Sequence, residues 1–120
     1  MRMSEKDTEL IAAFDEVVRR APLGACYPRE ALKNGDEPTY RTRNGLSAQC
    51  LTGKALERVG RFKDLPSRSE AQPNAGELLR SLGYSERLAY AAQEAQAWED
   101  IHKPWNVVLG RFHKFLKMDA

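Results

Sequence analysis

The chain has 120 residues, of which 42% are hydrophobic and 30% are charged, and its formal net charge is +2. This composition is typical of one globular domain, 1–120, and the near balance of charge favours no particular class of partner. No apolar run approaches the about 20 residues of a membrane-spanning helix, and the charged first residues do not resemble a secretory signal. Two cysteines are too few for a disulfide framework. We therefore expect a cytoplasmic protein with reduced thiols and no membrane association.

The first predicted helix starts at Ser4, a residue type that caps helices, with Asp7 three residues later in the capping-box position. Apolar residues then recur on one helical face as far as Ala21, and Pro22 and Gly24 end the pattern. That face contains Leu10, Ile11, Phe14, Val17, Val18 and Ala21. The pattern predicts a helix that packs one side against the core.

The segment that follows has no helical periodicity. Two short β-prone stretches, 26–27 and 39–42, flank a turn signal at 34–36, so one small β-hairpin near residues 25–43 is one expectation. A coil with a single helical turn at 29–33 is the alternative.

The segment 46–60 carries signals for both ends of a helix. Ser47 is predicted to cap its N-terminus, and Leu46 and Leu51 have the spacing of a hydrophobic staple around that cap. Gly60 supplies the left-handed residue that commonly follows a helix C-terminus.

Two small residues within this helix are informative. Gly53 costs roughly 1 kcal/mol relative to alanine, which predicts a close approach by another backbone, with a neutral surface glycine as the alternative. Cys50 is predicted to lie in the first turn, where the helix dipole favours a thiolate.

Three further helices are predicted in the C-terminal half. Asn74 and Glu77 have capping-box spacing at the start of a short helix that Gly83 closes. Ser85 starts a longer helix with a stripe of mostly small residues, and a last helix follows Pro104 with a full apolar face. The two faces contain Leu88, Ala91, Ala92, Ala95 and Trp98, and Trp105, Val108, Leu109, Phe112, Phe115 and Leu116, respectively.

These elements predict a mainly α fold. Five short, capped helices joined by short loops favour a compact orthogonal bundle, and no heptad run is long enough for a coiled coil. In the connection 61–73, Phe62 and Leu65 are expected to anchor the chain to the core. The two strongest apolar faces predict that Phe112 of the last helix packs against Phe14 of the first.

A family resemblance is carried by four short motifs. Residues 50–56 read Cys-Leu-Thr-Gly-Lys-Ala-Leu, after Cys26-Tyr27 and before Ala-Gln-Glu-Ala-Gln at 92–96 and Trp105. This order resembles a pattern in small uncharacterised proteins of actinobacteria and their phages, in which Cys-Tyr precedes Cys-x-x-Gly-x-Ala-Leu, and Ala-Gln-x-x-Gln-Asp and a tryptophan follow. The resemblance covers roughly residues 26–109.

The chain departs from that pattern at two positions. Ala97 stands where the pattern has Asp, and Gln49 replaces a small residue before the second cysteine. The resemblance implies no activity, and it favours a phage or prophage accessory protein.

A zinc site is one candidate function of the sulfur and imidazole groups. Cys26, Cys50, His102 and His113 make a Cys₂His₂ set by count, but zinc sites usually take ligands in close pairs. Here the cysteines are 24 positions apart and the histidines 11. This spacing favours two buried thiols and two surface or helix-end histidines, so we expect no metal and no cofactor.

Cys50 is also a candidate nucleophile. A helix-start position lowers the pKa of a thiol, and a histidine could act as its base. The alternative is that the thiol packs as a small hydrophobe, because cysteine is among the most buried residue types. No paired carboxylates, serine elbow, phosphate loop or metal motif suggests another enzyme.

Nucleic acid is a candidate ligand of the segment 41–68, which has seven basic and two acidic residues. The predicted phosphate contacts are Arg41, Arg43, Lys54, Arg58, Arg61 and Lys63. Separately, 75–97 has the rhythm of a helix-turn-helix. Its second helix would offer Arg87, Tyr90, Gln93 and Gln96. That helix also carries Glu86, Glu94, Glu99 and Asp100, which phosphates repel. A solvated charged face is the alternative.

A protein partner is the last candidate. Trp98 and Trp105 flank His102 at a corner between two helices, and tryptophan is enriched in binding hot spots, although both rings could instead belong to the core. We expect a non-enzymatic intracellular protein that binds a host protein or a second copy, such as a phage accessory factor. Nucleic-acid binding is the second hypothesis, and a thiol enzyme built on Cys50 is the third.

Overall fold

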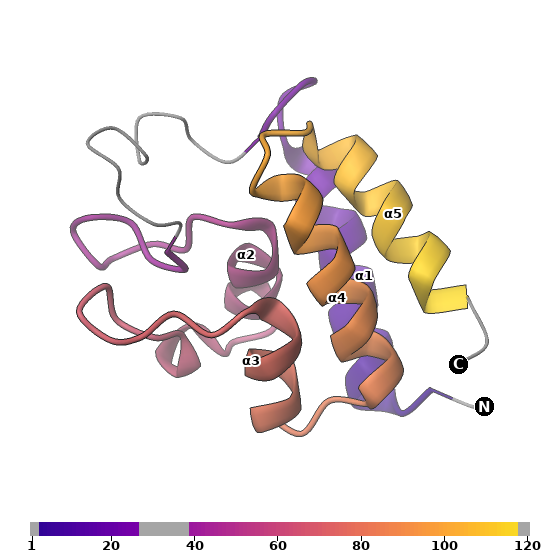
Figure 1. Ribbon diagram of the computed structural model, residues 1–120, viewed down its shortest axis with the longest axis horizontal. Helices are drawn as coiled ribbons and strands as arrows, with labels where there is room; N and C mark the ends of the chain where they lie inside the picture. Colours follow the sequence, from indigo (N-terminus) through magenta and orange to yellow (C-terminus); the bar gives the residue numbers. More distant parts are fainter. Residues whose placement is uncertain (1–2, 27–38, 118–120) are drawn as a thin grey trace.

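The computed structural model describes residues 3–26 and 39–117, and within them it has five α-helices and one 3₁₀ turn but no strand (Figure 1). The elements are α1 (Glu5–Arg20), α2 (Leu51–Arg58), η2 (Phe62–Asp64), α3 (Ala75–Ser81), α4 (Glu86–Glu99) and α5 (Trp105–Lys117). The predicted mainly α fold of about five helices is confirmed. The hairpin expected near 25–43 lies largely outside the described residues.

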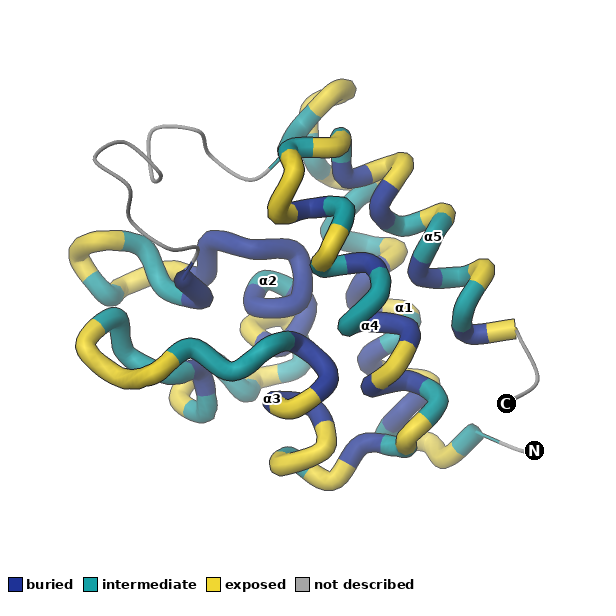
Figure 2. The backbone as a smooth tube through the Cα atoms, viewed as in Figure 1, coloured by how far each residue is buried: buried dark blue, intermediate teal, exposed yellow. Residues whose placement is uncertain are grey.

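The chain folds as a compact globule rather than as an elongated coil. Its radius of gyration is 13.4 Å, close to the roughly 14 Å expected of a globular chain of this length. Figure 2 shows why: buried positions run along one side of each helix and along the segment that enters α2.

α4 occupies the centre of the bundle, between α3 and α5, and it also contacts α2 (Figure 1). Its buried side chains are mostly small, which allows both neighbours to approach closely. They are Leu88, Ala89, Ala91, Ala92, Ala95 and Glu99. One close approach is at Gly76 of α3, where an added Cβ would lie 3.1 Å from the carbonyl oxygen of Ala89.

α1 is fixed at its start by two predicted residues. The Ser4 hydroxyl accepts a hydrogen bond from the Asp7 N–H at 3.1 Å, which confirms the predicted cap. The Asp7 side chain is buried, and its Oδ1 accepts from the Ser85 N–H at 3.1 Å. Asp7 therefore ties the start of α1 to the start of α4.

α5 packs across α1 as the apolar faces predict. The rings of Phe14 and Phe112 stack with their centroids 4.3 Å apart and their planes 19° from parallel. Both side chains are fully buried. In the connection before α3, Leu65 is buried and Phe62 packs partly against the core, so both expected anchors are confirmed.

The predicted start of α2 was wrong. The helix begins at Leu51 with Cys50 as its N-cap, and Ser47 lies outside it. The physical reason is a loop closure: Ser47 accepts from the Thr42 N–H, and Gln49 donates to the Tyr40 carbonyl, both at 2.9 Å. These bonds hold the chain extended up to the cap.

The closed loop contains one isolated antiparallel bridge, Arg41 to Ala48, around a turn where Gly45 has a φ of +74°. Leu46 lies in this loop and is 76% exposed, so the predicted hydrophobic staple does not form. At the other end of α2 the prediction holds, because Gly60 has a φ of +82°.

Candidate functional site

Cys50 and Gly53 act together at the start of α2. The Cys50 Sγ accepts a hydrogen bond from the Gly53 N–H at 3.2 Å, so the thiol takes the capping role usually given to a hydroxyl or carboxylate. A Cβ on Gly53 would lie 3.2 Å from that sulfur and 3.2 Å from the Tyr40 carbonyl oxygen. The expected close approach of another backbone to Gly53 is therefore confirmed.

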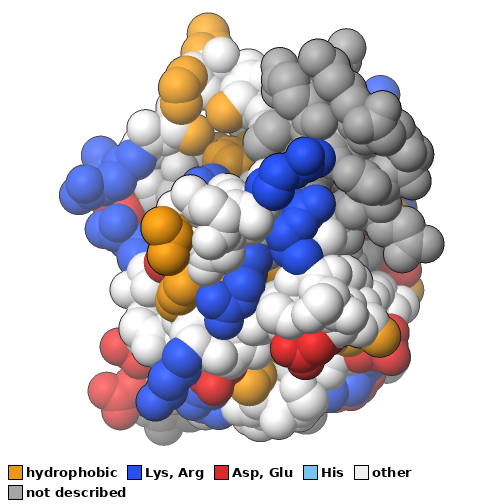
Figure 3. Space-filling view, turned by 90° about the vertical axis from the view of Figure 1, so that its left-hand side faces the viewer, with side chains coloured by type: hydrophobic (Ala, Val, Ile, Leu, Met, Phe, Trp, Pro, Cys, Tyr) orange, Lys and Arg blue, Asp and Glu red, His pale blue; other side chains and the backbone are white. Residues whose placement is uncertain are grey.

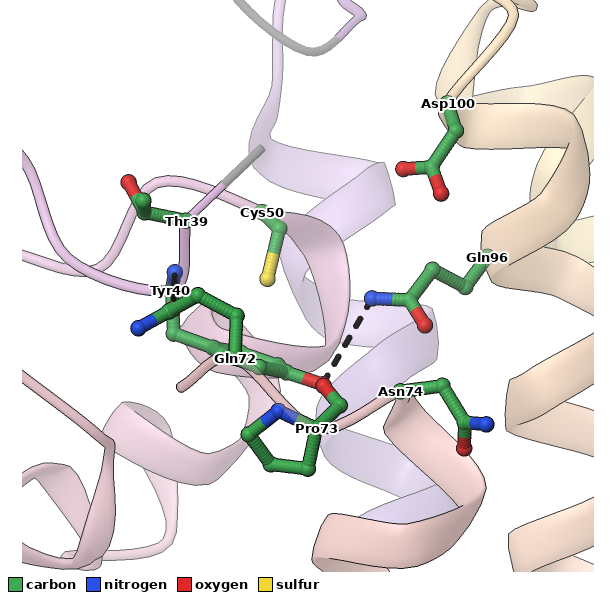
Figure 4. Close-up of a pocket in the computed structure, with 8 residues that line it drawn as sticks. All are labelled: Thr39, Tyr40, Cys50, Gln72, Pro73, Asn74, Gln96 and Asp100. Atoms are coloured by element: carbon green, nitrogen blue, oxygen red, sulfur yellow. Dashed lines mark hydrogen bonds between the residues drawn. The ribbon is translucent and has the colours of Figure 1, made fainter. Parts of the chain in front are cut away.

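A small cavity of about 180 Å³ lies beside this thiol (Figure 4). The Tyr40 hydroxyl donates to the Pro73 carbonyl at 2.8 Å and accepts from the Gln96 amide at 3.5 Å. Burial raises the pKa of Cys50 well above its ordinary value and raises the pKa of Tyr40 as well. No histidine is among the described residues that line the cavity. The carboxylate that lines it is Asp100, and the contact that the structure shows for the Cys50 sulfur is its cap on α2.

Glu99 is a buried residue that the sequence reasoning placed on a solvated face. Its side chain is 1% exposed, and its Oε2 accepts from the Leu51 N–H at 2.8 Å and from the Trp105 indole N–H at 2.6 Å. Desolvation raises the pKa of Glu99 to about 7, against the opposing effect of the two hydrogen bonds. A signal for this burial existed, because Glu99 continues the stripe of Leu88 and Ala95 at helical spacing.

Two arginines of the basic segment 41–68 are bonded within the loops. Arg41 points inward: its guanidinium donates to the carbonyls of Phe62 and Leu65 and stacks 4.4 Å from the Phe62 ring centroid. Arg68 donates to the Thr39 hydroxyl at 2.8 Å and to the Arg41 carbonyl at 3.4 Å. These two arginines hold the loops together, and their charges are bonded to neutral oxygens.

The other predicted phosphate contacts lie in different surroundings. Arg58 lies 3.5 Å from Glu16, and Arg61 lies 3.6 Å from Asp64 and above the Tyr84 ring. The remaining three differ in exposure and place: Arg43 and Lys63 are exposed on the loops, and Lys54 lines a groove beside α1.

In the helix-turn-helix alternative, the second helix corresponds to α4. Two of its predicted DNA contacts, Gln93 and Gln96, pack inside the protein instead. Gln96 accepts from the Ala75 N–H at 2.7 Å and donates to the Tyr40 hydroxyl, and the Gln93 amide lies against Gly76. These contacts face α3, so the two glutamines are not presented to a groove of DNA.

The tryptophan corner at 98–105 is present, but its rings are largely used internally. Trp105 is 6% exposed and donates to Glu99. Trp98 is half-buried, with the Arg111 guanidinium 4.5 Å from its ring centroid. His102 adopts a φ of +62° in the turn after α4. The indole rings therefore make internal contacts at this corner.

The same end of the molecule instead exposes three aliphatic side chains that the sequence reasoning missed. Leu23 is 99% exposed, Ile101 63% and Val107 38%, and we call these three the apical surface. The loop after α1 meets the α4–α5 connection here, because the Trp105 N–H donates to the Ala25 carbonyl at 2.7 Å (Figure 1).

A turn presents Leu23 at its tip. The Ala25 N–H donates to the Pro22 carbonyl at 3.0 Å, and Gly24 has a φ of +82°, as a tight turn requires. Proline followed two positions later by glycine was the sequence signal for this turn. Leu23 also lines a hollow of about 210 Å³ that reaches Asn106 at the start of α5.

Two absences concern the described residues only. Within 3–26 and 39–117, no three histidine, cysteine or acidic side chains are grouped as metal ligands, and His113 instead bonds Asp15 at 2.6 Å. None of the helices in the same ranges has the length and apolar character that would let it cross a membrane.

The chain was compared with known protein families, with curated proteins and with solved structures, and no match was found.

Proposed function

We propose that this protein binds another protein, a host protein or a second copy, through the apical surface of Leu23, Ile101 and Val107. The observation that carries the proposal is Leu23, an almost fully exposed leucine at the tip of a turn that is hydrogen-bonded at both sides. Single exposed leucines are common, but the loop that carries Leu23 is bonded to Trp105, which lies between Ile101 and Val107 in the chain. Exposed aliphatic side chains on adjoining segments are typical of an interaction site.

The backbone around this surface supports binding without a large ordering cost. The turn is fixed by the bond within Pro22–Ala25 and by the bond from Trp105 to Ala25. A preorganised side chain loses little conformational freedom when it is buried, so more of its hydrophobic free energy is available for association. Burying a leucine is worth about 1.5–3 kcal/mol. An accessory factor of a phage or prophage is a role compatible with such a surface.

Site-specific photo-crosslinking in cells tests this function. A photoreactive phenylalanine analogue at position 23 should give a discrete adduct, and the same analogue at position 46 should not. Leu46 is the matched control because it is also an exposed leucine, on the loop between Arg41 and Ala48. An adduct of twice the chain mass identifies a second copy, and another mass identifies a different protein. No adduct at position 23, or equal adducts at both positions, contradicts the proposal.

A second candidate function is nucleic-acid binding, and one observation favours it. Figure 3 shows a band of lysine and arginine side chains across the face that carries the loops. Arg41 and Arg68 belong to these loops, and their charges are bonded to neutral oxygens rather than to carboxylates. Lys63 is exposed in η2 next to the Phe62 carbonyl that Arg41 contacts.

The test of this candidate avoids the arginines that hold the loops. Replacing Arg43 and Lys63 with glutamate should abolish binding of duplex DNA at low salt, since phosphate contacts dominate such binding. Affinity of the unchanged protein should also fall steeply as salt rises. An absence of binding at low salt, or binding that survives the double substitution, excludes the face.

A further inference from the structure

The apical surface continues into a groove of about 510 Å³ between the end of α1, α2 and the start of α5. Its apolar wall is made of residues from three segments of the chain. These are Val17, Ala21, Pro22, Ala25 and Trp105. Pro22, Ala25 and Trp105 also line the hollow beside Leu23, so the two depressions are continuous around the same turn. We call the larger one the basic groove.

The same groove is also lined by positively charged side chains. Arg20, Lys54 and Arg58 line it together with one carboxylate, Glu57. The Glu57 Oε2 accepts from the Ala48 N–H at 3.3 Å, so this carboxylate also serves the loop on the far side of α2. Lys54 forms no ion pair with any carboxylate of the described residues.

The arginines beside the groove share one counter-charge. Glu16 is paired with Arg19, with Arg20 at 2.6 Å and with Arg58 at 3.5 Å. Hydrogen bonds from Arg19 and Arg20 lower the pKa of Glu16 to about 2, so it stays ionised at every physiological pH. Arg20, Lys54 and Arg58 line the groove against the carboxylates of Glu57 and, through its pairing with two of the arginines, Glu16, so the groove keeps an excess of positive charge.

We infer that the basic groove binds an acidic, apolar segment of a protein partner, with aliphatic side chains against Val17, Ala21 and Trp105 and carboxylates beside Lys54 and Arg58. Charge complementarity selects this occupant. A purely apolar segment would desolvate the cations without compensation, and a basic one would be repelled. This inference rests on the proposed function, because it gives the chemistry of the partner that the apical surface contacts.

The occupant is one that arginine recognises well. A guanidinium forms paired, charge-assisted hydrogen bonds with a carboxylate, and Arg58 is 41% exposed, so it can turn from Glu16 toward a ligand. Lys54, on the next turn of α2, adds a point charge on the same side of the helix. The apolar residues of the groove add hydrophobic contact area, which the charged groups alone do not provide.

Fluorescence anisotropy with purified protein and designed peptides tests the inference. The probe is a labelled peptide of about 12 residues built from leucine and glutamate. One matched peptide has lysine in place of each glutamate, and the other has serine in place of each leucine. The protein variant is Lys54→Gln with Arg58→Gln, which removes two charges without placing a carboxylate beside Glu16. The control variant is Arg43→Gln with Lys63→Gln, on the loop face.

The leucine–glutamate peptide should bind with a Kd below about 100 µM, and both matched peptides at least tenfold more weakly. The groove variant should weaken binding by about tenfold or more, the control variant should leave it unchanged, and about 500 mM salt should weaken it strongly. Equal binding of the glutamate and lysine peptides, or an unchanged affinity in the groove variant, overturns the inference. So does an absence of binding up to about 1 mM. The comparison of peptides uses the unaltered protein, so it does not depend on how the variant folds.

Failure of this inference can be told from failure of the proposed function. A cross-link from position 23 without peptide binding would support the apical surface as a protein contact and would contradict an acidic segment as the occupant of the basic groove. Peptide binding without any cross-link from position 23 in cells would contradict the proposed function instead.

Discussion

Glu99 joins three helices through one carboxylate oxygen. It sits at the end of α4, accepts from the first N–H of α2 and accepts from the indole of Trp105 at the start of α5. An isolated buried charge is expensive, and two hydrogen bonds offset only part of that cost, which is why burial raises the pKa of Glu99. We therefore expect the junction to respond to protonation of Glu99.

The first prediction is that the protein becomes less stable as pH rises toward neutrality. In the folded state the Glu99 carboxyl keeps its proton up to near pH 7, because its pKa is about 7. In the unfolded chain the same carboxyl loses its proton near the ordinary pKa of 4.5. The unfolded state thus binds fewer protons between these pH values. The free energy of unfolding should fall by up to about 1.4 kcal/mol per pH unit in this window and level off above it. Urea unfolding at a series of pH values measures this slope.

Substitution of Glu99 isolates its contribution. Glu99→Gln keeps an oxygen acceptor for Leu51 and Trp105 but cannot ionise, so its stability profile should be flatter than that of the unchanged protein. Glu94→Gln on the same helix is the control, since Glu94 is half-buried and faces Arg111. If Glu99→Gln retains the original slope, Glu99 is not the titrating group.

The second prediction concerns the two thiols. Burial raises the pKa of the Cys50 thiol, and the side chain is 4% exposed, so alkylation by iodoacetamide at neutral pH should be slow. Cys26 is half-buried and should react faster. Peptide mapping of the labelled protein separates the two rates, and denaturation should make them similar. Native Cys50 labelled as fast as free cysteine would contradict the capping role and bring the thiol-enzyme hypothesis forward.

At the scale of the elements, a helix end that is fixed by the side chains of its own cap could be predicted from the sequence. A helix end that is fixed by contacts with distant residues could not. The α3 capping box forms as expected, with the Asn74 side chain accepting from the Glu77 N–H and Glu77 accepting from Asn74. The start of α2 was missed because the bond from Gln49 to the Tyr40 carbonyl, which no local pattern encodes, delays the helix to Leu51.

The third prediction separates two glycines by their surroundings. Alanine is normally worth up to about 1 kcal/mol over glycine within a helix. At Gly110 of α5 nothing lies within 4 Å of an added Cβ, so Gly110→Ala should stabilise the protein. At Gly76 of α3 the Cβ would meet the Gln93 amide and the Ala89 carbonyl, so Gly76→Ala should destabilise it by about 1–3 kcal/mol. Urea midpoints of the two variants should move in opposite directions. Stabilisation by Gly76→Ala would mean that α3 and α4 do not pack closely at this point.

The fourth prediction concerns the α1–α5 contact. Phe112→Ala removes the ring that stacks on Phe14 at 4.3 Å and should lower the free energy of unfolding by about 3–5 kcal/mol. Phe115→Ala is the control on the same helix, because Phe115 is only half-buried and should cost less. Equal losses for the two variants would show that the stack is not central to the fold.

At the scale of the whole molecule, the sequence indicates which residues flank the corner between α4 and α5, but not which side chains are exposed there. Hydrophobic periodicity assigns aromatic residues to faces, and it located the corner of Trp98, His102 and Trp105. It could not tell that Trp105 faces inward while Leu23, 82 positions earlier, comes to the same end. That neighbourhood depends on how α1 and α5 pack.

The arrangement of charge on the surface also could not be predicted from the sequence alone. The sum over 41–68 predicted a basic segment without saying how its charges are arranged, and the structure turns Arg41 into the loops and places Lys54 and Arg58 beside α1. The basic groove therefore combines cations from α1 and α2 that are far apart in sequence. A net charge of +2 conceals this local excess.

Titration calorimetry with the partner identified by cross-linking tests the central claim most directly. The unchanged protein, Leu23→Ser and the control Leu46→Ser are compared against the same purified partner. Because burial of a leucine contributes about 1.5–3 kcal/mol, Leu23→Ser should weaken binding by at least about tenfold, and Leu46→Ser should bind as tightly as the unchanged protein. Equal affinities for all three proteins would contradict the assignment of the apical surface as the binding site.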